Sequence, residues 1–514
     1  MVTINLDGNT LSCDEVAMVA NGARVRVASD AWAGIEQARS VVEGILERGE
    51  TVYGINTGFG ALVSQRISPD DLAALQVNLI RSHACAIGEN MSINDTRAMM
   101  CVRANSLIKG CSGIQRIVLE QLITYLNQNI VPVIPRIGSL GASGDLAPLS
   151  HMALTLIGEG EVWDDSHHPI PTGAMLKQKG LIGVNLAAKD GLSLINGTSQ
   201  MCAFLSNVQQ RLANLMLFAD LIACTTIEAK RCSIKPMDHR VHDVRPHPGQ
   251  SLVAKRIRQI MAGSKIIESH ANCDQVQDAY SFRCIPQVHG AVNQRFIELC
   301  QTLTIEINSA TDNPLIFPDL ANPGPHEVIS QGNFHGEVLA LCADSMAHAI
   351  FELAHISERR IDQIVDPARS NLPAFLATDS GLESGMMIVH YVAAASLAEM
   401  HGHASPKSAF STPTSGGQED HVSMGATACW NLMQATDRLS EVLACELLIS
   451  CEALEHRVAE PAAHVNGLYN LVRVISKPLT GDRTTSKEIT RIAEEISAGA
   501  WLARLEAEHG RLAR

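Results

Sequence analysis

The sequence has no excess of basic residues and no long apolar run. Its 40 lysines and arginines are outnumbered by 54 aspartates and glutamates, which gives a formal net charge of −14 at pH 7. An acidic chain is poorly suited to bind the phosphate backbone of nucleic acids. No stretch reaches about 18 uninterrupted apolar residues, the length that a membrane-spanning helix needs. We therefore expect neither a nucleic acid nor a membrane as a partner.

The sequence also lacks a leader segment and an ordered cysteine pattern. Residues 1–25 do not follow the basic, apolar, small-residue order of a secretory signal. The 14 cysteines are scattered singly, without the spacing of a disulfide framework or a paired zinc site. We expect reduced thiols and a cytoplasmic location. Neither an HExxH motif nor a Gly-rich phosphate loop occurs, so we predict no metal site and no nucleotide site.

The composition is that of a large globular protein. Hydrophobic residues make up 46% and charged residues 18% of the 514 positions, values outside the range of disordered chains and coiled coils. Glycine and proline punctuate residues 1–200, which predicts a loop-rich N-terminal domain. Residues 201–478 are predicted to form a central domain, and residues 479–514 a C-terminal helical appendage. A chain of this length has room for two to four domains or for one extended helical architecture.

Long helices are predicted wherever glycine and proline are missing. Such stretches cover residues 198–235, 291–313, 337–366, 386–401 and 426–460. Within the first stretch, residues 207–231 carry apolar side chains around most of a helical circumference, which places that helix at the centre of the fold. The predicted fold class is therefore mainly α, with a central bundle of long helices.

One serine is surrounded by small residues in segment 138–150, which reads Gly-Ser-Leu-Gly-Ala-Ser-Gly-Asp-Leu-Ala-Pro-Leu-Ser. Taken alone, the segment predicts a tight turn that caps a helix. A serine-hydrolase elbow requires GxSxG, and here no residue stands between Ser143 and Gly144. A serine hydrolase is therefore disfavoured.

The run from Ala142 to His151 resembles the signature of the histidine, phenylalanine and tyrosine ammonia-lyase family. The resemblance implies that Ala142, Ser143 and Gly144 cyclise and lose water to form 4-methylidene-imidazol-5-one, with Asp145 assisting. Small side chains permit the compressed turn that this reaction needs. The resulting methylene is an electrophile that no ordinary side chain supplies. The family's fold, a fumarase/aspartase-like helical architecture, and its homotetramer with shared active sites are implied as well.

Other segments agree with this resemblance in chain order. Segment 53–60, Tyr-Gly-Ile-Asn-Thr-Gly-Phe-Gly, resembles the family's tyrosine loop, so Tyr53 is implied as the base that takes the substrate β-proton. Asn196 lies in the Asn-Gly-Thr segment that contacts cofactor and substrate carboxylate. Segment 277–287 resembles the one that supplies a second tyrosine and a carboxylate-binding arginine. In this segment the resemblance implies site roles for Tyr280, Arg283 and Gln287. Segment 331–336 also resembles the family, which implies that Phe334 lies near the cofactor ring.

Two positions indicate which aromatic ring is bound. An imidazole brings two ring nitrogens that need partners once buried. His83 lies in a Ser-His pair and Glu419 in a Gln-Glu-Asp-His run, and both short segments resemble those of the histidine enzymes. His401 and Gly417 depart from that pattern, where lysine and asparagine are usual. We predict conversion of L-histidine to trans-urocanate and ammonia. A tyrosine or phenylalanine ammonia-lyase, a 2,3-aminomutase of the same family and an inert helical scaffold remain the alternatives.

The cofactor hypothesis predicts that Ser143→Ala loses nearly all turnover of the aromatic amino acid and keeps its fold. The alanine has no hydroxyl to eliminate, so no exocyclic methylene forms. The measurement is urocanate absorbance during incubation with L-histidine, with circular dichroism to monitor the fold. Full activity in the variant would contradict the cofactor assignment.

Overall fold

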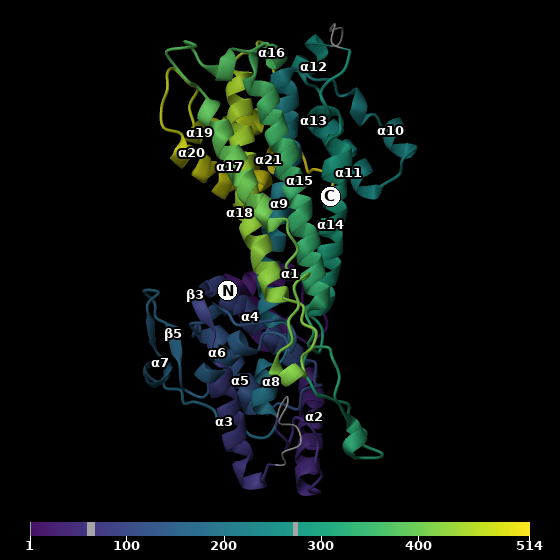
Figure 1. Ribbon diagram of the computed structural model, residues 1–514, viewed down its shortest axis with the longest axis vertical. Helices are drawn as coiled ribbons and strands as arrows, with labels where there is room; N and C mark the ends of the chain where they lie inside the picture. The colour runs from purple at the N-terminus through teal and green to yellow at the C-terminus, as the bar shows by residue number, and fades with distance from the viewer. Residues whose placement is uncertain (1, 59–66, 271–275) are drawn as a thin grey trace. The chain divides into compact units, whose positions relative to one another are not determined.

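The computed structural model describes residues 2–58, 67–270 and 276–514 of the chain (Figure 1). Contacts divide it into two compact units, each built from three chain segments. Unit 1 comprises residues 1–207, 300–343 and 406–430, and unit 2 comprises residues 208–299, 344–405 and 431–514. This division differs from the predicted boundaries at residues 200 and 478, because the chain contributes three separate segments to each unit.

Short helices and two-stranded sheets make up unit 1. Strand β1 pairs with β2 in parallel, with Thr3 opposite Arg24, whereas β3–β4, β5–β6 and β7–β8 are antiparallel pairs. Its strands are β1 (Thr3–Leu6), β2 (Arg24–Val27), β3 (Ile87–Asn90), β4 (Pro135–Ile137), β5 (Glu161–Trp163), β6 (Pro169–Pro171), β7 (Leu315–Ile316) and β8 (Val328–Ile329). Its helices are α1 (Cys13–Ala20), α2 (Ala31–Glu47), η2 (Pro69–Asp71), α3 (Leu72–His83), α4 (Ile93–Ile108), α5 (Arg116–Gln128), α6 (Leu146–Leu156), α7 (Thr172–Lys179), α8 (Asp190–Ile195), η4 (Pro325–Glu327) and η6 (Ser415–Gly417).

Helix α4 forms the core of unit 1. Every residue from Asp95 to Ile108 is buried, including two arginines. The helix begins at a serine cap, since Ser92 Oγ accepts a hydrogen bond from the backbone amide of Asp95. Arg97 and Arg103 meet backbone carbonyls instead of water, which offsets much of the cost of burying their guanidinium groups.

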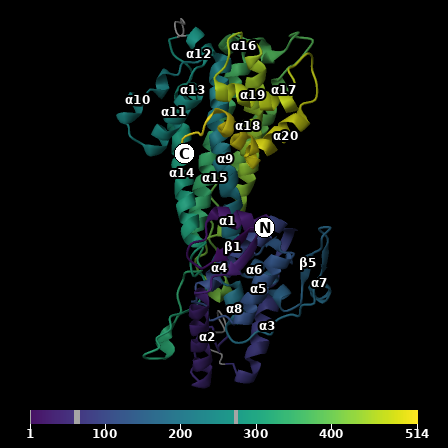
Figure 2. The same ribbon diagram turned by 180° about the vertical axis from the view of Figure 1, so that it is seen from behind.

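Long helices dominate unit 2, and some of them begin in unit 1. They are α9 (Ser199–Lys230), α14 (Ile285–Glu306), α15 (Glu337–Val365), α17 (Met387–His403) and α18 (Gly425–Leu454). The shorter helices are η3 (Lys235–Met237), α10 (His239–Asp243), α11 (Pro248–Ile260), α12 (Lys265–Ser269), α13 (Tyr280–Arg283), α16 (Pro367–Ser370), η5 (Ala374–Leu376), α19 (Ala463–Ile475), α20 (Ser486–Ala498) and α21 (Ala500–His509). In Figures 1 and 2, α9, α15 and α18 run side by side.

The prediction of a mainly helical fold with a central long-helix bundle is confirmed. Helix α9 is largely buried, with Val208, Leu212 and Leu221 fully inaccessible, and its partly exposed residues lie between positions 207 and 214 and at position 230. Helix α14 begins earlier than predicted because Pro286 lies in its first turn, where the missing proline N–H costs nothing. The predicted amphipathic C-terminal segment forms two helices, α20 and α21, which break at Gly499 and pack on α19 within unit 2.

A buried ionic network joins the long helices of unit 2. Glu446 of α18 accepts hydrogen bonds from Arg360 Nε at 2.6 Å and Nη2 at 2.8 Å. Thr226 of α9 also donates to this carboxylate, at 2.7 Å. Arg360 and Glu446 are 0% and 1% exposed. On α14, His289 Nδ1 lies 2.6 Å from Asp220 of α9, which also pairs with a buried arginine of α11.

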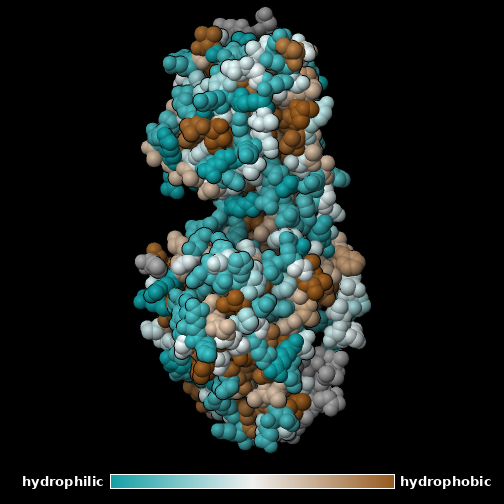
Figure 3. All heavy atoms as spheres, turned by 90° about the vertical axis from the view of Figure 1, so that its left-hand side faces the viewer, coloured by the Kyte–Doolittle hydropathy of each residue, from teal (hydrophilic) through white to brown (hydrophobic). Residues whose placement is uncertain are grey.

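Two helices, α9 and α15, are long and apolar enough to cross a membrane by length and composition alone. Their most apolar 18-residue windows are 89% and 56% buried within the protein, and core helices pass the same test. On the face drawn in Figure 3, polar side chains cover much of the surface and apolar ones gather in separate patches. Burial of α9 is therefore explained by packing inside the helix bundle.

The buried network predicts a large stability loss for Glu446→Ala. The substitution leaves the Arg360 guanidinium buried without its carboxylate, which should lower the free energy of unfolding by about 3–5 kcal/mol. Glu508→Ala is the matched control, because the Arg504–Glu508 pair is 63% and 48% exposed and should change stability little. Denaturant midpoints of the two variants give the comparison; equal losses would contradict a special role for the buried pair.

Candidate active site

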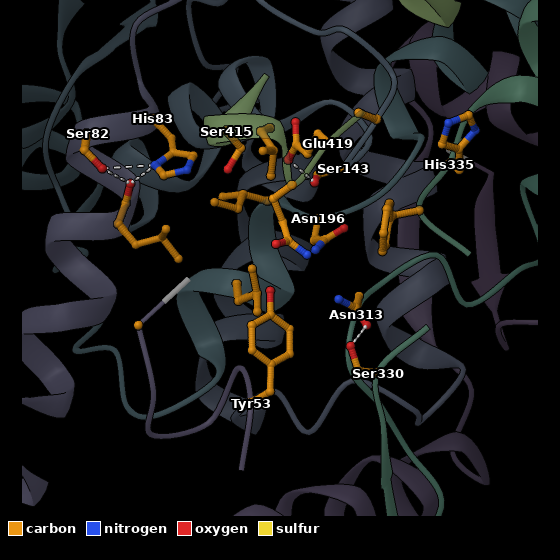
Figure 4. Close-up of a pocket in the computed structure, with 18 of the residues that line it drawn as sticks. Tyr53, Ser82, His83, Ser143, Asn196, Asn313, Ser330, His335, Ser415 and Glu419 are labelled. Atoms are coloured by element: carbon orange, nitrogen blue, oxygen red, sulfur yellow. Dashed lines mark hydrogen bonds between the residues drawn. The ribbon is translucent and has the colours of Figure 1, made fainter. Parts of the chain in front are cut away.

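The candidate active site is a cavity of about 1200 Å³ that lies within unit 1 (Figure 4). Segments far apart in sequence meet there: the turn after α2, helix α3, the Ala-Ser-Gly segment, the end of α8 and two later loops. Seven residues predicted from the sequence line it, namely Tyr53, His83, Ala142, Ser143, Asn196, Phe334 and Glu419. Gly144 lies directly behind Ser143, buried against residue 197. The fold therefore brings together most of the predicted site.

A hydrogen-bonded turn presents Tyr53 to the cavity. Asn56 closes this turn: its Oδ1 accepts from the amide of Val52 at 2.9 Å, and its Nδ2 donates to the carbonyl of Glu50 at 2.7 Å. In Figure 4 the phenol points toward Asn196. The last two residues of the predicted tyrosine loop, 59 and 60, lie outside the described residues.

The Ala-Ser-Gly segment is a turn anchored on both sides. Before it, the carbonyl of Gly141 accepts from the amide of Gly336 at 2.9 Å. After it, Gly144 forms a parallel bridge with Gly197. Gly144 has φ of +73°, and a Cβ there would lie 2.2 Å from the carbonyl oxygen of Gly197. Only glycine fits that position, and the compressed backbone suits the cyclisation that the family resemblance implies.

Asp145 links the Ala-Ser-Gly segment to the start of helix α9. Its amide donates to the carbonyl of Gly197 at 2.7 Å, and its carboxylate accepts from Ser139 Oγ at 2.8 Å and from the amide of Gln200 at 2.7 Å. A carboxylate at a helix N-terminus is favoured by the unpaired amides there. Burial nevertheless raises the pKa of the Asp145 carboxyl to about 7.

Asn196 ends helix α8 with its side chain in the cavity. The residue is 4% exposed, and its Oδ1 is buried without a hydrogen-bond partner in the described part of the chain. Such an oxygen is costly to bury unless a ligand or cofactor supplies a donor. Together with the compressed turn at Gly144, the unpaired oxygen fits a cofactor made from residues 142–144. Sequence reasoning identified Asn196 only through the family's Asn-Gly-Thr segment.

Glu419 lies against the cofactor segment. Ser143 Oγ donates to its Oε1 at 2.7 Å, and Thr414 Oγ1 donates to its Oε2 at 2.9 Å. Backbone pairing of Thr414 with Glu419 fixes the loop that carries the carboxylate. The dashed bond in Figure 4 marks the contact with Ser143. If Ser143 loses its hydroxyl, Oε1 loses this donor and is available to a substrate.

His83 is the last residue of α3, and its ring points into the cavity (Figure 4). Its Nδ1 lies 2.9 Å from the carbonyl oxygen of Leu79. A carbonyl only accepts, so Nδ1 carries the proton and Nε2 keeps its lone pair. Burial lowers the pKa of His83, which keeps the imidazole neutral near pH 7. His83 therefore offers a hydrogen-bond acceptor to a ligand.

Several lining residues were not predicted from the sequence. Asn313 and Gln331 occupy the wall near Phe334, where Asn313 Oδ1 accepts from the amide of Gln331 at 2.9 Å. His335 lies beside them, with Nε2 at 3.2 Å from the carbonyl oxygen of His421. Gln331 and His335 lie in segment 331–336, of which only Phe334 was predicted as a site residue, and Asn313 lies in no predicted motif. Only the tertiary fold brings the loops of residues 313–335 and 415–421 together.

Three predicted residues do not line this cavity. Tyr280, Arg283 and Gln287 belong to unit 2. Tyr280 is 71% exposed, and the Arg283 guanidinium stacks over its ring at 4.7 Å. Gln287 Oε1 is buried without a hydrogen-bond partner in the described chain. None of the three is among the residues that line the cavity, and their roles remain predictions.

A sequence profile of the family described as aromatic amino acid lyase matches residues 11–474. The chain belongs to the aromatic amino acid lyase family. It is thus a carbon–nitrogen lyase. Histidine ammonia-lyase of Myxococcus xanthus (strain DK1622) is 43% identical to this lyase over 502 residues, which cover 97% of this chain and 98% of that protein.

Solved structures of the same family share the fold of this aromatic amino acid lyase. The crystal structure of histidine ammonia-lyase from Trypanosoma cruzi superposes with a TM-score of 0.91 at 37% identity, covering 98% of this chain and 95% of that one. The structure of tyrosine aminomutase from Streptomyces globisporus superposes with a TM-score of 0.93 at 35% identity, covering both chains fully. The fold is therefore common to relatives named for different substrates and reactions.

The raised pKa of Asp145 predicts how the stability of this lyase depends on pH. Because the folded pKa of about 7 exceeds the ordinary aspartate pKa of 3.8, the folded state holds a proton that the unfolded state releases. Stability should fall as pH rises through this window, by about 1.4 kcal/mol per pH unit. Between pH 5 and pH 7 the wild type should therefore lose about 2 kcal/mol relative to Asp145→Asn, because the slope falls to half as the pH reaches the folded pKa.

Denaturant midpoints at pH 5 and pH 7 measure this difference. Asp30→Asn is the matched control, because Asp30 stands at the start of α2 but is exposed; its pH dependence should follow that of the wild type. Parallel curves for the wild type and Asp145→Asn would show that the carboxyl titrates alike in both states.

Proposed function

We propose that this lyase converts L-histidine to trans-urocanate and ammonia. The observation that carries the proposal is that two hydrogen-bond acceptors, His83 Nε2 and the Glu419 carboxylate, line the same cavity. An imidazole side chain carries one nitrogen-bound hydrogen, or two when it is protonated, that can be donated to such acceptors, whereas a phenyl ring has none. The histidine ammonia-lyase of Myxococcus xanthus, 43% identical over nearly the whole chain, supports the same substrate. The enzyme is proposed to act in the cytoplasm.

The proposed cofactor is 4-methylidene-imidazol-5-one formed from Ala142, Ser143 and Gly144. When formed, it supplies an electrophilic methylene that makes the amino group a better leaving group. The fixed turn at residues 141–145 holds the three residues in the cavity wall. Asp145 is placed to assist, because its amide and carboxylate both fix the backbone that follows Gly144.

The chain's own residues divide the remaining work. Tyr53, whose phenol points toward Asn196 (Figure 4), is proposed to remove the β-proton. Asn196, with its unpaired Oδ1, is proposed to meet the cofactor and substrate carboxylate. Phe334 lines the wall of the cavity and is proposed to pack near the reacting groups. The fixed dipoles of these residues would stabilise charge that develops in the transition state.

The need for a cation to bind the substrate carboxylate supports a homotetramer whose subunits share active sites. Among the described residues that line the cavity, acidic side chains occur but no lysine or arginine. A carboxylate is best bound by a guanidinium, which matches its two oxygens. We propose that Arg283, with Tyr280 and Gln287, completes the site of another copy of the chain. Partly exposed Arg283 beside an exposed Tyr280 suits that role.

Helix α17 presents an apolar face that fits the same assembly. Ile388, Tyr391 and Val392 are 53%, 61% and 39% exposed, and the exposed residues Ala394, Ala395 and Ala398 follow them along the helix. A large apolar patch on one helix is typical of a subunit interface. A second copy is the proposed occupant, and analytical ultracentrifugation measures the assembly.

A 2,3-aminomutase is the second candidate, favoured by the likeness to tyrosine aminomutase of Streptomyces globisporus. In that reaction the ammonia stays bound and returns to the β-carbon. Incubation with L-histidine, L-tyrosine and L-phenylalanine separates the candidates. We expect urocanate and free ammonia from L-histidine; a β-amino acid would identify a mutase, and coumarate or cinnamate would overturn the proposed substrate.

The pocket chemistry predicts the effect of His83→Leu. Loss of the Nε2 acceptor leaves a substrate ring N–H unpaired, so kcat/KM for L-histidine should fall on the order of a hundredfold. The same change removes no partner of a phenyl ring, so kcat/KM for L-phenylalanine should hold or rise. Steady-state kinetics with both substrates make the comparison. An equal fall in kcat/KM for both substrates would indicate that His83 does not discriminate between the substrate rings.

A further inference from the structure

Arg103 lies directly beneath Asn196, on the side away from the cavity. It belongs to α4 and is 0% exposed. Its Nη1 donates to the carbonyl of Asn196 at 2.6 Å, and its Nη2 donates to the carbonyl of Ser193 at 2.5 Å. Arg103 is not among the residues that line the cavity, so any effect on the reaction must pass through the backbone that it holds.

The carbonyls that Arg103 binds belong to a helix end that needs partners. Helix α8 has six residues, and Asn196 leaves it with extended backbone angles of φ −96° and ψ 114°. The last carbonyls of a helix have no intrahelical donor, and an unpaired carbonyl is costly when buried. The guanidinium supplies two donors in a fixed fork. It therefore fixes the direction in which the chain, and the Asn196 side chain, leaves α8.

The same guanidinium also packs against Gly197. A Cβ at Gly197 would lie 2.5 Å from Arg103 Nη1, and the residue has φ of +145°, so only glycine fits there. The carbonyl of Gly197 in turn accepts from the amide of Asp145 at 2.7 Å. Arg103 thus supports a two-residue turn with Asn196 facing the cavity and Gly197 facing the Ala-Ser-Gly segment.

We propose that Arg103 is a positioning residue for the reaction, acting through Asn196. By holding the carbonyls of Ser193 and Asn196, it fixes the orientation in which the Asn196 amide meets substrate. The proposal rests on the proposed function, since it assumes that Asn196 contacts the substrate. Burial lowers the pKa of Arg103 to about 10, so the group stays charged near pH 7 and keeps its donors.

A double-mutant cycle tests this proposal. We expect Arg103→Lys to lower kcat for L-histidine about tenfold to a hundredfold, because small misplacements of a positioning group cost that much. In an Asn196→Ala background the same change should lower kcat less than about twofold further, since coupled residues are not additive. Each kcat is divided by the fraction of chains whose 142–144 peptide has lost water, measured by mass spectrometry.

A second readout needs no turnover. In the Ser143→Ala background, calorimetry gives the Kd of unreacted L-histidine. Arg103→Lys should raise this Kd about tenfold when Asn196 is present and leave it unchanged when Asn196 is alanine. Should Arg103→Lys not accumulate as folded protein, Arg103→Gln replaces it in both cycles, because its amide keeps neutral donors at the same place.

Arg97 provides a matched control on the same helix. It is 2% exposed and donates to the carbonyls of Val19 at 2.9 Å and Leu126 at 3.0 Å. Like Arg103, it is a buried arginine bound to backbone carbonyls, but it does not bind the carbonyl of Asn196. Arg97→Lys should lower thermal stability and leave corrected kcat unchanged. Independent effects of Arg103 and Asn196, or an equal kcat loss in Arg97→Lys, would overturn the proposal. If L-histidine is not the substrate, the cycle is run with the amino acid that is turned over. A wrong substrate proposal is thereby distinguished from a wrong role for Arg103.

Discussion

The site depends on one backbone contact, the bridge between Gly144 and Gly197. It joins the segment proposed to form the cofactor to the turn that carries Asn196. The amide of Asp145 extends the bridge to the carbonyl of Gly197, and the Asp145 carboxylate extends it to the first amides of α9. Because α9 is a largely buried helix of 32 residues, the Ala-Ser-Gly segment is tied to the core of the fold.

Burial accounts for how this region tolerates its charges. Asp145, Arg103 and Lys189 are fully inaccessible to solvent. Each is hydrogen-bonded: Asp145 to helix amides, Arg103 to carbonyls, and Lys189 to Asp312 at 2.5 Å. Buried charges of this kind are expensive without partners. The cost is offset by backbone groups near helix ends for Asp145 and Arg103, and by the Asp312 carboxylate for Lys189.

The sequence predicted the helices better than the boundaries between units. Stretches without glycine or proline identified α9, α15 and α18. A long helix can be predicted in this way because it requires only an uninterrupted run of helix-compatible residues. The units were not predictable in this way, since each draws on three distant segments. Among site residues, Ser143 and Asn196 were found by motif. Arg103 carried no signal, because a buried arginine on a polar-looking helix is indistinguishable from a surface one until tertiary contacts are known.

The two residues proposed to contact the substrate ring make the same demand on it, a hydrogen-bond donor. His83 Nε2 and the Glu419 carboxylate both accept hydrogen bonds, but a neutral imidazole has only one N–H to donate. Both acceptors are satisfied only when the substrate ring is protonated and carries two N–H groups. A phenol satisfies one of them and a phenyl ring neither. Before maturation the Ser143 hydroxyl satisfies Glu419 instead. Loss of that hydroxyl would therefore create the electrophile and expose the acceptor together, so that the proposed substrate finds its full set of partners only in the matured site.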